Sequence, residues 1–253
     1  MASSPPEPRF FAAPDGVRLA WREMGEGRPV VLLHGFFSDA GTNWIKYGHA
    51  ERIAATGRRV VMPDLRAHGD SERPHDPAAY PPDVLASDGH ALVAHLRLTD
   101  YDLGGYSLGA RMAVRMLAIG ATPGRIVLGG MGLNGILDVG ARAAHFRRIL
   151  TGLGSFERGS AEWLAEGFLR TTGGDPVALL HLLDSFVDTS RGELAAIDRP
   201  VLVVSGVDDQ DNGSAADLAR ALVDGRYVEV PGNHMSAVVK RELGEAMVAF
   251  LAR

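Results

Sequence analysis

Short, mostly apolar runs alternate with longer stretches of mixed polarity along most of the chain. Apolar residues dominate residues 29–33, 59–63, 125–130 and 200–206. Runs of this length and composition are typical of strands buried on both faces of a parallel sheet. The pattern therefore predicts four central strands, and residues 101–106 and 226–230 add two more.

The stretches between these runs predict helices. In residues 84–96, apolar side chains recur at helical spacing, and Asp83 is expected to cap the first turn. Further helices are predicted at residues 50–56, 108–119, 214–223 and 236–251. Strands that alternate with helices through short links indicate an α/β fold, with a parallel sheet covered on both sides.

Two regions depart from this alternation. Residues 9–13 and 17–23 flank the turn Pro14-Asp15-Gly16 and predict a β-hairpin. Residues 132–197 contain no clear strand, and helices are expected at 141–150, 161–169 and 176–187. We interpret residues 133–197 as a helical insertion above the strand ends, with 1–132 and 198–253 forming the core.

Composition narrows the class of protein. The chain has 253 residues, of which 46% are hydrophobic and 23% charged, and its net charge is -5. These values are typical of a globular protein and give no basic surface for nucleic acid. There is no cysteine, no apolar run of about 20 residues and no secretory leader in the Pro- and Ser-rich residues 1–8, which predict a flexible tail. We expect a cytoplasmic protein that does not insert into membranes.

The nine histidines do not form a recognisable metal motif. No His-Glu-x-x-His pair occurs, and His90 and His95 are five residues apart, which is a poor spacing for one helix face. We therefore expect neither a catalytic metal nor a cofactor.

Residues 101–112 are the most informative stretch for chemistry. They predict a strand, an abrupt turn and a helix, with Ser107 at the turn between Gly105 and Gly109. Glycines at these two positions let the strand and the helix approach each other. A serine on such a turn, called a nucleophile elbow, is lifted toward solvent, and the start of the helix favours negative charge beside it.

Other reactive side chains also follow predicted strands. His34, Asp64, the cluster at residues 208–211 and His234 each come just after a strand end. Because functional groups gather beyond the carboxyl ends of parallel strands, these residues can converge with Ser107 on one edge of the sheet.

A serine hydroxyl needs a base and a group that orients the base. His234 is the candidate base. Three carboxylates, Asp208, Asp209 and Asp211, compete for the third role, and we favour Asp209, followed by Asp211 and then Asp208. The backbone N–H groups of Phe36 and Leu108 are the expected donors to an oxyanion.

These motifs together resemble the α/β-hydrolase fold superfamily, in particular its serine esterase and lipase-like branch with a helical cap. The matching pieces cover nearly the whole chain and are residues 34–36, 64–71, 105–109, 206–209 and 232–234. The resemblance implies a mostly parallel eight-stranded sheet. It also supports Asp209 as the acid, and a structural role for Asp64 and residues 66–71. A serine nucleophile argues against the haloalkane dehalogenase and epoxide hydrolase branches, which attack with a carboxylate.

The expected activity is cleavage of small to medium carboxylic esters through an acyl-enzyme on Ser107. A lactonase, a carbon–carbon bond hydrolase or a perhydrolase would use the same three residues. The fold also hosts small-molecule receptors without turnover, and a scaffold with a vestigial site is a third class. Aromatic side chains expected to line the substrate pocket are Phe37, Trp44, Tyr106, Trp163 and Phe168, with Phe36 and Phe186 as further candidates. The sequence carries no signal for the oligomeric state.

Overall fold

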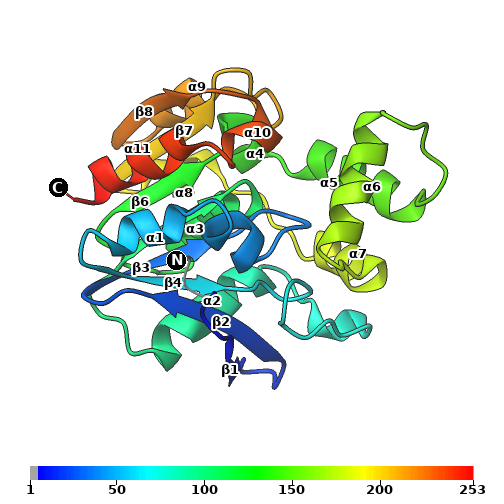
Figure 1. The fold of residues 1–253 in the computed structure, drawn as a ribbon, viewed down its shortest axis with the longest axis horizontal. Helices are drawn as coiled ribbons and strands as arrows, with labels where there is room; N and C mark the ends of the chain where they lie inside the picture. Colours follow the sequence, from blue (N-terminus) through cyan, green and yellow to red (C-terminus); the bar gives the residue numbers. More distant parts are fainter. Residues whose placement is uncertain (1–4, 253) are drawn as a thin grey trace.

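A single sheet of eight strands forms the centre of the protein (Figure 1). The structure, a computed structural model, describes residues 5–252, so the first half of the predicted N-terminal tail lies outside the described residues. The strands are β1 (Arg9–Ala12), β2 (Arg18–Met24), β3 (Arg28–Leu33), β4 (Arg58–Pro63), β5 (Asp102–Tyr106), β6 (Ile126–Gly129), β7 (Pro200–Gly206) and β8 (Asp224–Val230).

The strand order is β1-β2-β4-β3-β5-β6-β7-β8. β1 pairs antiparallel with β2, and β2 pairs antiparallel with β4. All the remaining pairs are parallel, which confirms the predicted mostly parallel, eight-stranded sheet. The carboxyl ends of β3, β5, β7 and β8 consequently meet at one edge.

Helices cover both faces of the sheet because successive strand residues point to opposite sides. On β3, Val30 and Leu32 pack in one apolar cluster with side chains of α1 (His49–Ala54) and α11 (Arg241–Leu251). Val31 and Leu33 pack in a second cluster with α2 (Val84–His95) and α3 (Leu108–Ala118). The continuously apolar runs in the sequence thus correspond to strands buried on both faces.

The other helical elements lie in the connections. They are a π-helical turn η1 (Gly41–Ile45), a 3-10 turn η2 (Pro77–Ala79), α4 (Leu133–Leu137), α5 (Gly140–Thr151), α6 (Ala161–Thr171), α7 (Pro176–Asp184), α8 (Arg191–Ala195), α9 (Ala215–Ala221) and α10 (His234–Ala237). No helix within residues 5–252 is both long enough and apolar enough to cross a membrane.

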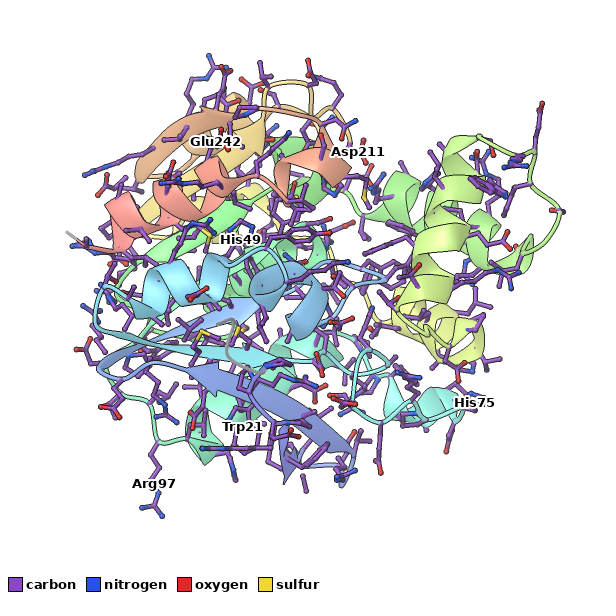
Figure 2. The ribbon with its side chains drawn as sticks, in the orientation of Figure 1. Trp21, His49, His75, Arg97, Asp211 and Glu242 are labelled. Atoms are coloured by element: carbon purple, nitrogen blue, oxygen red, sulfur yellow. The ribbon has the colours of Figure 1, made fainter. Side chains whose placement is uncertain are left out.

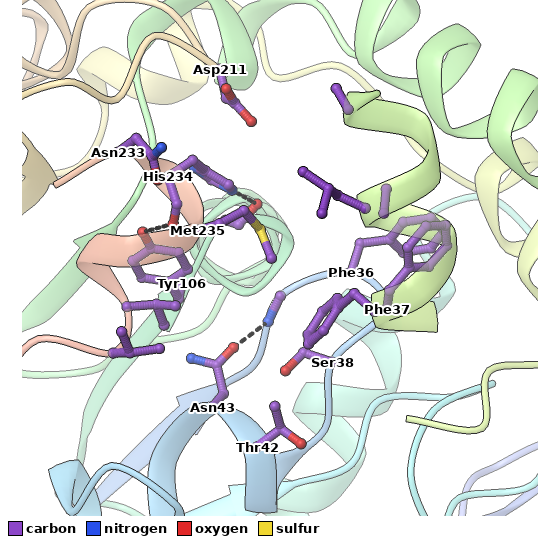
Figure 3. Close-up of a pocket in the computed structure, with 18 of the residues that line it drawn as sticks. Phe36, Phe37, Ser38, Thr42, Asn43, Tyr106, Asp211, Asn233, His234 and Met235 are labelled. Atoms are coloured by element: carbon purple, nitrogen blue, oxygen red, sulfur yellow. Dashed lines mark hydrogen bonds between the residues drawn. The ribbon is translucent and has the colours of Figure 1, made fainter. Parts of the chain in front are cut away.

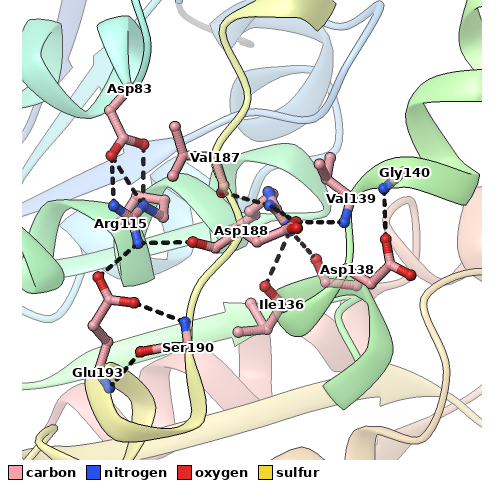
Figure 4. Close-up of polar contacts among 12 residues, drawn as sticks. Asp83, Arg115, Ile136, Asp138, Val139, Gly140, Val187, Asp188, Ser190 and Glu193 are labelled. Carbon is pink, nitrogen blue, oxygen red and sulfur yellow. Dashed lines mark hydrogen bonds and ion pairs between the residues drawn. The ribbon is translucent and has the colours of Figure 1, made fainter.

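Two local predictions were wrong. The predicted helix at 236–251 is divided into α10 and α11. At the break, His49 Nε2 lies 2.7 Å from the Val238 carbonyl. In a continuous helix this carbonyl would instead accept a hydrogen bond from the helix backbone. Asp83 precedes α2 but makes no capping hydrogen bond. Its carboxylate instead accepts from Arg115 Nε at 3.0 Å (Figure 4).

Residues 133–197 contain five helices, α4 to α8, and no strand. Figure 1 shows α5, α6 and α7 as a group to one side of the sheet. The helical character of this stretch follows the sequence pattern, whereas its status as a separate insertion remains a prediction.

Hydrogen bonds to α3 hold both ends of this helical segment. Arg111 donates to the carbonyls of Ile136 at 3.2 Å and Val187 at 2.6 Å. Arg115 donates to the Asp188 carbonyl at 3.2 Å and to Glu193 at 3.0 Å, and Figure 4 shows these contacts. Because both arginines are almost fully buried, the segment is fixed to the helix that begins at Ser107.

The far side of the segment also contacts the core. Thr172 Oγ1 donates to the Phe37 carbonyl at 2.7 Å. The Nε2 atom of His75 lies 2.7 Å from Asp175 Oδ2, and Figure 2 shows His75 near this part of the segment. These contacts place the end of α6 beside the loop that follows β3, and the start of α7 beside the connection that follows β4.

Candidate active site

The turn between β5 and α3 has the geometry of a nucleophile elbow. The backbone of Ser107 adopts φ 54° and ψ -116°, a conformation that residues other than glycine rarely take. A Cβ atom at Gly105 would lie 2.2 Å from the Gly109 carbonyl carbon, and one at Gly109 would lie 2.0 Å from the Leu33 carbonyl oxygen. Neither glycine can therefore be replaced without moving the backbone, and the close contacts force Ser107 into the tight turn.

Three side chains from distant parts of the sequence form a hydrogen-bonded series. Ser107 Oγ lies 3.0 Å from His234 Nε2, and His234 Nδ1 lies 2.9 Å from Asp209 Oδ2. The carboxylate can only accept, so Nδ1 carries the imidazole proton and Nε2 is free to accept from the Ser107 hydroxyl. This arrangement lets His234 remove the serine proton while Asp209 orients the ring and stabilises its charged form.

Asp209 is held as a carboxylate. Its Oδ1 accepts from the Asp211 N–H at 3.1 Å, and its Oδ2 accepts from Ser205 Oγ at 3.3 Å. Burial alone would raise the pKa of Asp209, but the hydrogen bond and charge of His234, together with these two donors, lower the pKa below its ordinary value. The group beside His234 is therefore ionised at neutral pH.

The other two candidate acids lie elsewhere. Asp208 is exposed at the pocket beside Ser107. Asp211 Oδ2 accepts from Arg142 of α5 at 2.9 Å, and Figure 2 shows Asp211 on the side of the core that faces α5. Among these three carboxylates, only Asp209 lies within hydrogen-bonding distance of His234.

The loop that carries His234 is fixed at both sides of the histidine. Asn233 forms a capping box with Ser236, which begins α10 at His234. The hydroxyl of Tyr106 donates to the His234 carbonyl at 2.6 Å. Tyr106, the residue before the serine, thus positions the backbone of the histidine (Figure 3).

The loop after β3 runs directly beside the serine. A methyl group at Gly35 would lie 3.5 Å from Ser107 Cβ. Within residues 5–252, neither the Phe36 N–H nor the Leu108 N–H has a hydrogen-bond acceptor. Phe36 and Leu108 therefore remain the proposed oxyanion donors.

Asn43 holds this loop in place, and the sequence analysis did not identify it. Its Oδ1 accepts from the Gly35 N–H at 3.0 Å, and the side chain is buried (Figure 3). The neighbouring peptide presents the Phe36 N–H. Asn43 is therefore a positioning residue for one of the two proposed oxyanion donors.

Replacing Asn43 with alanine should reduce kcat for an ester substrate by about 10- to 100-fold, somewhat less than complete loss of an oxyanion donor. KM should change little, because ground-state contacts remain. The Thr42→Ala variant, at a neighbouring position in the same pocket with no contact to Gly35, is the matched control. An Asn43→Ala enzyme with unchanged kcat would show that the loop is positioned without this side chain.

His34 and His68 lie behind the loop and have structural contacts. His34 Nε2 accepts from the Leu65 N–H at 2.9 Å, and His68 Nδ1 lies 3.0 Å from the Arg66 carbonyl. Asp64, which the resemblance assigns a structural role, accepts from the Ala40 N–H at 2.8 Å and from Arg22 at 2.9 Å. None of these three side chains lines the pocket beside Ser107.

Acid should destabilise the fold through His68. Its complete burial, and secondarily the adjacent His34, lowers the pKa of His68 from 6.5 to about 3. The unfolded chain binds a proton near pH 6.5 whereas the folded chain does not, so the free energy of unfolding falls by about 1.4 kcal/mol per pH unit as the pH drops below that value. Urea unfolding at a series of pH values should show this slope, and His68→Asn should make it shallower. An unchanged slope in that variant would assign the acid sensitivity to other groups.

A cavity of about 700 Å³ opens beside Ser107 and His234 (Figure 3). Three of the predicted pocket residues, Phe37, Tyr106 and Phe168, line it, and so does Phe36. The walls are largely apolar. Such a cavity suits a small organic molecule with few charges.

Two predicted pocket residues, Trp44 and Trp163, do not line this cavity. Trp44 is only 1% exposed and packs in the apolar cluster between the sheet and α1. Trp163 is 38% exposed on α6. The residues of α6 that line the cavity are Ala161, Leu164, Ala165 and Phe168, which share one helix face, and Trp163 lies outside this spacing.

Sequence reasoning missed the contribution of α5. Arg142, His145 and Phe146 of this helix line the cavity, and the Phe146 ring centroid lies 4.7 Å from that of Phe36. Helical periodicity predicted α5 but not which of its faces meets the loop after β3. Phe186, a further candidate, lines a smaller cavity on another side of Ser107.

No group of three or more histidine, aspartate or glutamate side chains suited to a metal ion occurs in the described part of the chain.

A mostly parallel eight-stranded sheet with a serine on a strand-to-helix turn, followed in sequence by an acid and a histidine, defines the α/β-hydrolase class. The sequence profile of the alpha/beta hydrolase family matches residues 30–242, and the chain belongs to this family. It is accordingly a hydrolase-type enzyme.

Individual proteins are similar to this chain in sequence or in fold. The chain is 28% identical to a non-heme haloperoxidase of Rhodococcus erythropolis over 88% of this chain and 91% of that protein. It is 31% identical to the AB hydrolase superfamily protein YisY of Bacillus subtilis, but this match spans only 43% of the chain and 39% of the relative. An esterase from Exiguobacterium antarcticum has the same fold, with a TM-score of 0.77 at 22% identity over 98% of this chain and 100% of that one.

Proposed function

We propose that this protein is a serine esterase that cleaves carboxylic esters of small molecules. The single observation that carries the proposal is the hydrogen-bonded series from Asp209 through His234 to Ser107 at the wall of the apolar cavity. A base aligned with a serine hydroxyl, together with free N–H groups beside it, is the equipment of acyl transfer.

The proposed reaction has two halves. Ser107 Oγ attacks the ester carbonyl carbon while its proton moves to His234 Nε2, and the N–H groups of Phe36 and Leu108 stabilise the oxyanion. The C–O bond to the alcohol then breaks, and the leaving oxygen takes the proton from His234. A water molecule next gives a proton to His234 and attacks the acyl carbon, and Ser107 recovers its proton as the acid leaves.

Steady-state hydrolysis of p-nitrophenyl acetate tests the proposal. We expect many turnovers per enzyme molecule, and none above background in the Ser107→Ala variant. A burst of one p-nitrophenolate per enzyme without further turnover would contradict an esterase and favour a receptor on the same fold.

A second candidate is a perhydrolase, in which hydrogen peroxide replaces water in the second half of the reaction. The likeness over most of the chain to a protein named as a non-heme haloperoxidase supports this alternative. Peracid formation from an ester in the presence of peroxide, compared with simple hydrolysis, separates the two. A lactone and a diketone in the same panel test the lactonase and carbon–carbon hydrolase alternatives.

We further propose a cytoplasmic location for the enzyme.

A further inference from the structure

Ser107 lies between two cavities of very different size. The larger has a volume of about 700 Å³ and the smaller about 30 Å³, and Ser107, Phe36 and Phe146 belong to the walls of both. An ester carbon bonded to Ser107 Oγ carries an acyl substituent and an alcohol oxygen, which need separate spaces. If each half of the ester occupies one cavity, the sizes of the two cavities determine which half of the substrate can be large.

The position of His234 indicates which cavity receives the alcohol part of the ester and which receives the acyl part. The leaving alcohol must take its proton from His234 Nε2, and the incoming water must give a proton to the same atom. His234 lines the larger cavity and does not line the smaller one, whereas Leu108 lines only the smaller. The alcohol consequently lies in the larger cavity and the acyl substituent in the smaller.

The smaller cavity, at about 30 Å³ against about 700 Å³, accommodates a far smaller substituent than the larger one. Arg111, which is only 3% exposed, forms part of its wall, and the Arg111 Nε atom has no partner in the described residues. This wall residue is therefore almost fully enclosed, and it has little room to move away from a longer alkyl chain.

Hydrogen bonds to backbone carbonyls hold two side chains of the smaller cavity's wall in place. Arg111 donates to the Ile136 and Val187 carbonyls, which fixes the backbone on both sides of the cavity. Asn212, another wall residue, donates to the Gly130 carbonyl at 2.9 Å. A closely packed and tethered wall of this kind does not expand readily around a longer substituent.

The larger cavity has the opposite character. Its walls include Phe146, Leu164 and Phe168 from α5 and α6, and Met235 and Val238 from α10 and its C-terminal end. These side chains form an apolar space that can bury an aromatic or branched alcohol group.

We propose that the preferred substrates are short-acyl esters, of the acetate type, of bulky apolar alcohols. This inference rests on the esterase activity proposed above and specifies which side of the ester carries the bulk. Phe186 lines only the smaller cavity and Phe168 only the larger one, so the two phenylalanines offer a matched test of the assignment.

A pair of isomeric esters tests the proposal directly. 2-Naphthylmethyl acetate and methyl 2-naphthylacetate have the same atoms and similar intrinsic reactivity, but the bulky group lies on opposite sides of the ester. We expect kcat/KM to favour the acetate by at least about 100-fold, the upper range for exclusion by an apolar pocket. Equal rates, or a preference for the methyl ester, would overturn the proposal while leaving the esterase function intact. If the enzyme hydrolysed none of the three esters, p-nitrophenyl acetate included, that result would contradict the esterase function itself.

Enlarging the smaller cavity should relax the acyl preference. In Phe186→Ala, and in Val139→Ala as a milder second variant, the ratio of kcat/KM for the butyrate to that for the acetate of the same alcohol should rise by about 10-fold or more. Phe168→Ala should alter the range of alcohols without altering this ratio. A rise in the ratio in Phe168→Ala alone would reverse the assignment of the two cavities.

Discussion

Replacing Ser107 with alanine is expected to lower kcat/KM for a short-acyl ester by at least about 10⁴-fold. The hydroxyl is the only group of the site positioned both to attack the carbonyl and to pass its proton to His234 Nε2, 3.0 Å away. The residual rate would come from binding and from the N–H groups of Phe36 and Leu108, which the substitution leaves in place.

Stability should separate this loss from misfolding. Among residues 5–252, Ser107 Oγ bonds only to His234, and alanine can adopt the same backbone conformation as serine at comparable cost. The melting temperature should therefore stay within a few degrees of the wild type. Ser38→Ala, which changes a serine in the same cavity without a contact to the triad, should keep most of the activity. A Ser107→Ala enzyme that retains a tenth of the activity would exclude Ser107 as the nucleophile.

Replacing Asp209 with asparagine is expected to reduce kcat by about 10⁴-fold. An asparagine can turn its NH₂ group toward His234 Nδ1 and stabilise the wrong tautomer, in which Nε2 carries the proton and cannot accept from Ser107. It also removes the charge that stabilises the protonated imidazole. The Asp209 carboxylate lies 2.9 Å from His234 Nδ1. Burial raises the pKa of Asp209, but the contact with His234 outweighs this effect and lowers the pKa. Orienting the imidazole and stabilising its charge therefore both depend on this contact.

The neighbouring carboxylates provide matched controls. Asp208→Asn and Asp211→Asn make the same change within two residues, but Asp208 is exposed and Asp211 pairs with Arg142 at the edge of the cavity. Each should change kcat by less than about 10-fold, since exposed ion pairs contribute little. A severe loss in Asp211→Asn beside an active Asp209→Asn would transfer the role of triad acid to Asp211.

Much of the fold could be predicted from local patterns. Val30 to Leu33 and Val60 to Met62 are continuously apolar because both faces of their strands are covered, and this pattern indicated a parallel sheet. Ser107 could be identified because the glycines at positions 105 and 109 are required by contacts with the adjacent backbone. Features dictated by local sterics are visible in a sequence.

Features that depend on how elements face one another could not be predicted. Trp44 and Trp163 have the composition of pocket residues, but the first packs under α1 and the second lies off the inner face of α6. Phe146 lies in a helix that was predicted, on a face that periodicity alone does not assign. Asn43 acts through the Gly35 N–H, a contact within the connection between β3 and α1 for which the sequence carries no signal.

The choice among the three carboxylates shows the same limit. Asp208, Asp209 and Asp211 are equivalent in charge and nearly so in position along the chain. Only the turn after β7, in which the Asp211 N–H folds back to Asp209, directs one of them toward His234. Spacing suggested the choice, and the three-dimensional contact supports it.

Covalent labelling with a fluorophosphonate, followed by mass spectrometry of the digested protein, tests the central claim most directly. We expect one phosphonyl adduct on Ser107, loss of ester hydrolysis in step with labelling, and much slower labelling of the Asp209→Asn variant than of Asp211→Asn. Complete loss of hydrolysis with the adduct on a different residue and Ser107 unmodified would contradict it.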